Sequence, residues 1–166
     1  MMDSYGESVT ELKPNDVFVF GSNLDGFSGA GAAGFASFGR PGNIWRQEGY
    51  AAKPNGWKGK WNVKGVGEGL QEGREGTSYA LPTVTRAGAK RSRTPEQIVI
   101  SIKKMYATAE QSPDKRFLIA GSTTGRLLNG YSHDEMVTMY AEAGPIPSNV
   151  VFSTSYAVLV DAIIKS

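Results

Sequence analysis

The sequence contains no cysteine among its 166 residues, which excludes disulfide bonds, thiol catalysis and cysteine-ligated metal sites. It contains one histidine, and one histidine with scattered carboxylates does not make a metal cluster, so no metal or other cofactor is expected. The formal net charge of +2 argues against wholesale electrostatic binding of nucleic acid. No apolar run approaches the roughly 20 residues that span a bilayer, and the first residues lack the features of a secretory signal. We therefore expect a cytoplasmic protein with no membrane partner.

What is present is ordinary for a globular protein except for glycine. The length predicts one domain over residues 1–166. Of the 21 glycines, 15 fall between Gly21 and Gly76, and glycine allows positive φ and close approach of the backbone to a ligand. Residues 40–76 are expected to form a Gly- and Trp-rich loop insertion, either a lid over a ligand or a loop pinned to the body. That stretch holds all three tryptophans: Trp45, Trp57 and Trp61.

Apolar runs and capping residues predict the secondary structure. Four runs predict strands at residues 16–21, 78–84, 116–121 and 149–154. Because they are runs and not alternations, each strand should be covered by helices on both faces. Capping boxes at Thr94 and Ser132 predict the starts of two helices, and residues 155–165 predict a third. This order predicts an α/β domain with a mainly parallel sheet.

The predicted strands end in small, polar segments: "FGSN", "LPTVT", "AGSTTG" and "FSTS". In open α/β sheets, ligands sit outside the carboxyl ends of the strands, where loops and helix N-termini offer backbone N–H groups. The four endings together therefore predict a pocket lined by amides and hydroxyls. The alternative is that they are ordinary turns, which favour the same residues.

The stretch "GAGAAG" (29–34) matches G-x-G-x-x-G, but its context does not fit a dinucleotide-binding fingerprint. Seven residues separate it from the strand that ends near Gly21, and Glu48, at the required distance, is in no buried strand. A Walker A loop is absent as well. The small residues still allow a phosphate to approach a helix N-terminus closely, or a small-residue helix to pack tightly on the sheet. The segment 120–132 has the same order of strand, small residues, loop and helix, so the two loops could clamp a diphosphate.

Five motifs in the order "VFVFGSN", "GAGAA", "GEGLQ", "SYALPT" and "NGYS" resemble a macro-domain-like family found in bacteria and their phages. The resemblance spans about Val17 to Ser132. It implies a three-layer α/β/α fold with a largely parallel, mixed sheet. It also implies that the protein binds ADP-ribose or a related adenine-nucleotide derivative at the carboxyl ends of the strands.

The resemblance also implies which residues contact the ligand. Asn23 would lie near the distal ribose, the "GAGAA" segment would line the diphosphate, and the loop 122–131 would be the opposing clamp. That loop is longer than is usual in the family, and Arg126 stands where small residues are usual, where it could pair with a phosphate. The acidic residue that many macro domains use on adenine has no counterpart beside "FVFGSN". The predicted ligand-binding residues are Gly21, Ser22, Asn23, Gly29, Ala30, Gly31, Ala32, Ser122, Thr123, Thr124, Gly125, Arg126, Asn129, Gly130 and Tyr131.

Hydrolysis of a phosphoester or ADP-ribosyl bond would need a positioned water and an acid or base. Asp25 and Glu68 are the predicted catalytic carboxylates, although Asp25 equally fits a turn residue. His133, the first residue after a helix cap, is a weaker candidate for a base. The sequence thus leaves open a nucleotide hydrolase and a binding module without turnover. A third possibility, a nucleic-acid-binding protein, rests on the tryptophans and the four basic residues of "RAGAKRSR" (86–93), which equally fit a solvated loop.

Overall fold

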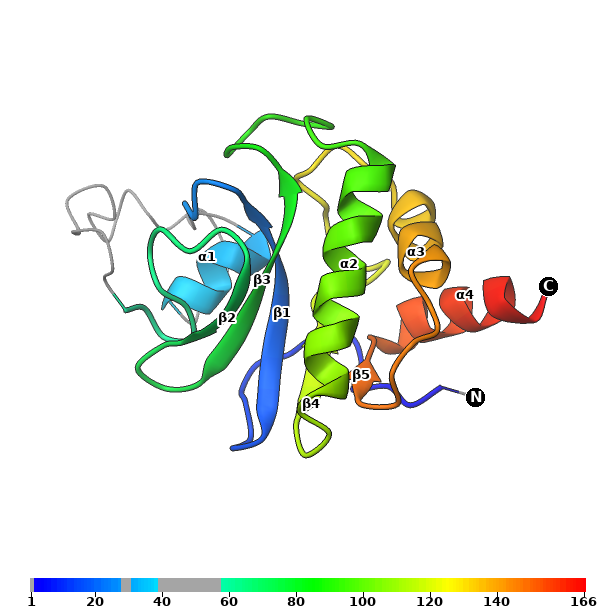
Figure 1. The fold of residues 1–166 in the computed structure, drawn as a ribbon, viewed down its shortest axis with the longest axis horizontal. Helices are drawn as coiled ribbons and strands as arrows, with labels where there is room; N and C mark the ends of the chain where they lie inside the picture. Colours follow the sequence, from blue (N-terminus) through cyan, green and yellow to red (C-terminus); the bar gives the residue numbers. More distant parts are fainter. Residues whose placement is uncertain (1, 28–30, 39–57) are drawn as a thin grey trace.

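The computed structural model describes residues 2–27, 31–38 and 58–166, and these form a five-stranded sheet with four helices (Figure 1). The sheet order is β2-β3-β1-β4-β5. Strand β2 pairs antiparallel with β3, and the other three pairings are parallel. The prediction of an α/β fold with a largely parallel sheet is confirmed. The elements are β1 (Asp16–Asn23), α1 (Gly31–Phe38), β2 (Gly69–Glu72), β3 (Thr77–Val84), α2 (Pro95–Glu110), β4 (Arg116–Ile119), α3 (His133–Glu142), β5 (Val150–Val151) and α4 (Thr154–Lys165).

The central strand β1 is buried on both faces, which produces the three layers. Val17 and Val19 belong to a large apolar core that also contains residues of α2, α3 and α4. Phe18 and Phe20 point to the opposite face, into a smaller core shared with α1 and Trp61. Figure 1 shows α1 on one side of the sheet and α2 on the other. The expectation of a strand covered on both faces is confirmed for β1.

Two helices begin where the capping boxes predict. The side chain of Thr94 accepts a hydrogen bond from the Gln97 N–H, and the Gln97 side chain accepts one from the Thr94 N–H. Ser132 and Glu135 make the same reciprocal pair at the start of α3. Such caps stabilise a helix by about 1 kcal/mol each, because they satisfy N–H groups that have no intrahelical partner.

Strand β2 was not predicted from the sequence. Its four residues carry no apolar run, since Leu70 and Glu72 are exposed and Gln71 is buried. An edge strand of this kind is held by its pairing with β3 and not by the burial of a hydrophobic stretch. It lies in the described part, 58–76, of the expected insertion.

The chain order places a crevice beside the carboxyl end of β1. From β1 the chain passes through α1 and β2 to β3, on one side of β1, and then through α2 to β4 on the other side. The helices after the adjacent parallel strands β1 and β4 cover opposite faces, so their loops diverge there. The N-termini of α1, α3 and α4 reach the same edge. None of the described helices is long and apolar enough to cross a membrane.

Candidate functional site

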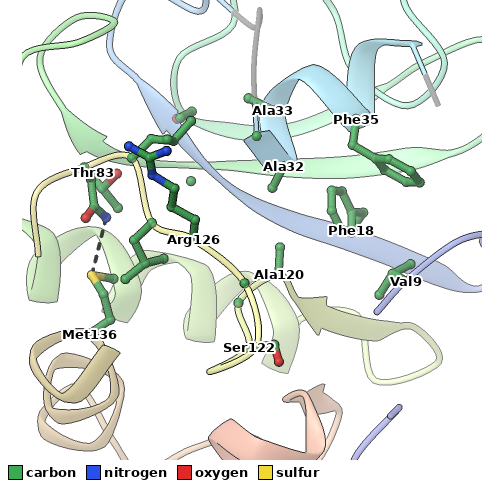
Figure 2. A pocket seen from close by; sticks show the side chains of 18 of the residues that line it. Val9, Phe18, Ala32, Ala33, Phe35, Thr83, Ala120, Ser122, Arg126 and Met136 are labelled. Atoms are coloured by element: carbon green, nitrogen blue, oxygen red, sulfur yellow. Dashed lines mark hydrogen bonds between the residues drawn. The ribbon is translucent and has the colours of Figure 1, made fainter. Parts of the chain in front are cut away.

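A cavity of about 910 Å³ lies at this edge of the sheet (Figure 2). Its wall is built from the N-terminal segment 5–10, the ends of β1 and β3, the start of α1, the loop 120–129 and the starts of α3 and α4. The volume is within the range of about 300–1,000 Å³ that small-molecule sites occupy. The position agrees with the pocket predicted from the strand endings.

Most of the predicted ligand-binding residues line this cavity. Thr123, Gly130 and Tyr131 do not, and Gly29 and Ala30 lie outside the described residues. Tyr131 is buried, and its hydroxyl donates a hydrogen bond to the Arg93 carbonyl, so its role there is structural. The predicted residues that line the cavity are Gly21, Ser22, Asn23, Gly31, Ala32, Ser122, Thr124, Gly125, Arg126 and Asn129.

At the end of β1, the polar side chains are engaged with the protein itself. The Ser22 hydroxyl donates to the Gly67 carbonyl at 2.5 Å. The Asn23 side chain accepts from the Phe27 N–H at 3.1 Å and donates to the Phe27 carbonyl at 2.8 Å. Asn23 therefore shapes the loop 23–27, and its predicted contact with a distal ribose stays a prediction.

The loop 122–131 divides into two unlike halves. In the first half, the N–H groups of Thr123, Thr124 and Gly125 donate to Ser155 Oγ, Ser122 Oγ and the Ser122 carbonyl, at 3.1, 3.2 and 2.9 Å. In the second half, the N–H groups of residues 126–128 find no acceptor among the residues that the structure describes. The second half therefore offers free donors at the cavity wall.

Arg126 adds a positive charge to this half of the loop. Figure 2 shows its side chain extending along the cavity toward Thr83, away from Ser122. Within residues 2–27, 31–38 and 58–166, no carboxylate pairs with its guanidinium. An arginine with free donors in a cavity is suited to a phosphate, because its planar fork can make two parallel hydrogen bonds to one.

The start of α1 faces the same half of the loop. Gly31 has φ +60°, and a Cβ added there would lie 3.0 Å from Leu128 Cδ1. The first N–H groups of α1 have no intrahelical partner, and they donate no bond to another described residue. A helix N-terminus carries partial positive charge and favours an anion. Glycine at residue 31 keeps this approach open.

The opposite end of the cavity contains Glu7, which the sequence analysis missed. Its carboxylate accepts hydrogen bonds from the Ser155 N–H at 2.9 Å, from the Ser155 hydroxyl at 3.0 Å and from the Ser122 hydroxyl. These bonds, that of Ser122 first, lower the pKa of Glu7. The bridge between Ser4 and Phe152 brings the N-terminal segment here. An acidic residue sought only beside "FVFGSN" could not be Glu7, because a long-range pairing brings Glu7 to the cavity.

An apolar wall adjoins this end. Figure 2 shows Val9, Phe18 and Phe35 grouped on one side of the cavity, with Ala32 and Ala120 nearby. Trp61 packs behind the two phenylalanines, with ring centroids 5.1 Å from Phe18 and 5.3 Å from Phe35. It is 1% exposed, which fits the pinned-loop interpretation and not a lid. Trp45 and Trp57 lie outside the described residues.

The two predicted catalytic carboxylates do not line the cavity. Asp25 is exposed in the turn after β1, which agrees with the alternative interpretation as a turn residue. Glu68 precedes β2, and its buried Oε2 atom has no hydrogen-bond partner among the residues that the structure describes. Their catalytic roles stay predictions.

His133 does line the cavity, and both of its ring nitrogens are hydrogen-bonded, one to the Gly125 carbonyl and one to the Tyr156 hydroxyl. No group of three metal-ligating side chains occurs in the described part of the chain.

The basic segment 86–93 is partly committed to the fold. Arg91 makes two hydrogen bonds to the Glu135 carboxylate, at 3.2 and 3.1 Å, and its guanidinium lies 4.4 Å from the centroid of the Tyr131 ring. The Arg91 hydrogen bonds, with those from Ser132, lower the pKa of Glu135 to about 2. Arg93 donates to the Pro82 carbonyl and to the Ser101 hydroxyl. Two of the four basic side chains are therefore used to hold this segment against its neighbours.

A scan against protein-family models finds no match for the chain, and no curated protein matches its sequence.

Proposed function

We propose that this chain binds ADP-ribose or a related adenine-nucleotide derivative in the cavity at the carboxyl edge of its sheet. The observation that carries the proposal is that two sets of N–H groups have no partner among the described residues. One set belongs to residues 126–128 and the other to the start of α1, and Leu128 and Gly31 bring the two sets close together. N–H groups that the protein leaves unpaired are available to a ligand, and a phosphate supplies several acceptor oxygen atoms at once.

The charge distribution of the cavity supports a ligand with two unlike ends. Arg126 favours the phosphates. At the other end, the Glu7 carboxylate beside the wall of Val9, Phe18 and Phe35 is suited to a flat base that carries an amino group. This would supply the acidic partner for adenine that the sequence analysis did not find. The macro-domain resemblance points to the same class of ligand.

We propose ligand binding only, and we assign no chemical reaction to the cavity. Asp25 and Glu68 are outside the cavity wall, so neither is placed to activate water on a ligand held there. Glu7, the carboxylate in the wall, accepts three hydrogen bonds from the protein. A depressed pKa makes Glu7 a weak base, and its three hydrogen bonds leave one of the roughly four acceptor sites of a carboxylate for a ligand.

Calorimetric titration of the purified protein with ADP-ribose, AMP and adenosine tests the proposal. We expect saturable micromolar binding of ADP-ribose, weaker binding of AMP and the weakest binding of adenosine, because each step removes phosphate contacts. Equal affinity for all three would exclude phosphate binding by the N–H groups of residues 126–128 and of the start of α1. Absence of saturable heat with ADP-ribose and with its phosphorylated and cyclised derivatives would exclude the ligand class. Chromatography of the ligand after incubation then shows whether it leaves the protein unchanged.

A further inference from the structure

The peptide bond between Gly125 and Arg126 joins the two unlike halves of the loop 122–131. The Gly125 N–H is bonded within the first half, whereas the Arg126 N–H is the first of the free donors. In a planar trans peptide the C=O and N–H bonds point in opposite directions. The direction of the Gly125 carbonyl therefore decides where the Arg126 N–H points.

Glycine alone does not fix that direction. Gly125 is exposed, and a Cβ added there would meet one atom within 4 Å, the Ser122 carbonyl oxygen at 3.4 Å. A glycine in so open a position rotates readily about its backbone bonds. Something outside the loop must hold the carbonyl if the next N–H is to stay aimed at a ligand.

His133 holds it. Its Nε2 atom lies 2.9 Å from the Gly125 carbonyl oxygen. A carbonyl only accepts, so Nε2 carries the hydrogen and donates it. The Arg126 N–H must then leave the loop on the side away from His133.

Tyr156 in turn fixes the histidine. Its hydroxyl lies 2.6 Å from His133 Nδ1, and the two rings meet edge to face at 77° with centroids 5.6 Å apart. Tyr156 is 1% exposed, and burial raises its pKa well above the ordinary value, so the hydroxyl keeps its proton. In the tautomer that carries its hydrogen on Nε2, Nδ1 is an acceptor, and the Tyr156 hydroxyl can donate to it.

We propose that His133 is a positioning residue that orients the Gly125–Arg126 peptide so that the Arg126 N–H is presented to an anionic group of the ligand. The inference rests on the proposed function, because it assigns the free N–H to a ligand phosphate. It differs from the role weighed for His133 in the sequence, that of a base. In the present assignment the imidazole never touches the ligand.

Two variants of His133 separate the effect of its N–H donor on the peptide from the effect of its ring volume. His133→Phe keeps a ring against Tyr156 but removes the donor. His133→Gln loses the ring but restores an N–H that can reach a carbonyl. Thr138→Ala, an exposed change on the same helix, is the control. ADP-ribose is titrated by calorimetry, and adenosine, which lacks phosphates, by amide chemical shifts.

We expect His133→Phe to weaken ADP-ribose binding about tenfold, the effect of losing one hydrogen bond to a charged acceptor, and to leave adenosine binding within about twofold. His133→Gln should recover part of the loss, and Thr138→Ala should match the wild type. Equal weakening of both ligands, or no weakening, would overturn the assignment while leaving the proposed function intact. A wild type that binds neither ligand would overturn both.

A crystal structure of ligand-free His133→Phe gives a readout that does not depend on affinity. We expect the Gly125 carbonyl to leave its present direction, with the rest of α3 in place. A carbonyl that keeps its direction without the imidazole would show that His133 does not orient the peptide. That result would overturn the inference even if affinity had fallen.

Discussion

The two ends of the cavity differ in how their polar groups are used. At the Glu7 end, the carboxylate, the Ser122 and Ser155 hydroxyls and the Thr123 N–H are all bonded to one another. At the Arg126 end, the guanidinium and the N–H groups that follow find no partner in the described part of the chain. The first end is already ordered by the protein, whereas the second leaves donors available for the proposed anion. Unpaired donors, more than the number of polar groups, therefore indicate where a ligand would add the most hydrogen bonds.

The largest expected effect comes from filling the space at the start of α1, at the Arg126 end of the cavity. Gly31→Glu adds a side chain at φ +60°, against Leu128, and a negative charge where an anion is proposed to bind. We expect ADP-ribose affinity to fall by more than about 100-fold, because like charges in contact cost several kcal/mol. Gly65→Glu is the matched control, since Gly65 also has positive φ, has open space and lies outside the cavity wall. Retained affinity in Gly31→Glu would remove α1 from the site.

The next effect comes from removing the charge at the same end. Arg126→Ala should weaken ADP-ribose binding by about 10- to 100-fold and flatten its dependence on salt concentration, with Arg126→Lys intermediate because lysine lacks the bidentate fork. Arg74→Ala removes an exposed positive charge outside the cavity wall and should have no effect. Calorimetry at two salt concentrations measures both quantities. An identical salt dependence in Arg126→Ala and the wild type would place the phosphates elsewhere.

At the other end, Glu7→Gln should act on the base and not on the phosphates. The substitution replaces an acceptor oxygen with an N–H₂ group among the Ser122 and Ser155 donors. We expect ADP-ribose and adenosine to lose affinity by a similar factor of about ten. Comparison with Arg126→Ala, which should spare adenosine, sharpens the distinction between the ends. A loss confined to ADP-ribose would show that the two ends have been assigned the wrong way round.

A smaller effect is expected on stability in acid. The Glu135 pKa falls from 4.5 in the unfolded reference to about 2 in the fold, chiefly through Arg91. A lowered carboxyl pKa stabilises the fold above the unfolded value, and this stabilisation is lost as the pH falls from about 4.5 to about 2. Glu135→Gln should therefore lower the midpoint of thermal unfolding by at most a few degrees near neutral pH, since the pair is exposed. The difference from the wild type should vanish toward pH 2, and a difference that is constant with pH would assign it to the cap instead.

The smallest effect is expected from the carboxylate that the sequence favoured for catalysis. Asp25→Ala should leave ADP-ribose affinity unchanged, since this exposed side chain does not line the cavity. If the protein turns the ligand over, the rate should also be unchanged. Loss of turnover with retained binding would restore the original prediction for Asp25, and would mean that the loop 23–27 moves toward the ligand.

Local signals in the sequence were enough to predict most of the fold. The Thr94 and Ser132 caps mark the starts of α2 and α3, because each needs only residues within one helical turn. The apolar run at residues 16–21 identifies β1, because a strand covered on both faces has no polar side. Strand β2 escaped prediction because its pairing with β3, and not its own composition, makes it a strand.

The sequence predicted those site residues that lie in segments following predicted strands. Arg126 lies in the loop after one predicted strand, and Gly31 begins the helix that follows another, so their approach to one edge follows from a parallel sheet. Glu7 could not be found this way, since it reaches the cavity through contacts with Ser155, 148 positions away. The roles of the Asn23 and Ser22 side chains depend on partners in nearby loops, which no motif specifies.

The contact between Glu7 and Ser155 has a consequence for the order of synthesis. Glu7 precedes Ser155, its partner at the start of α4, by 148 positions, so Glu7 leaves the ribosome long before that partner emerges. Until then one wall of the cavity has no counterpart, although β1, α1 and β3 are already available to fold. Both ends of the cavity are therefore completed only when α4 has docked, because Ser155 bonds Glu7 at one end and Tyr156 fixes His133 beside the Gly125–Arg126 peptide at the other. Full affinity should appear only then.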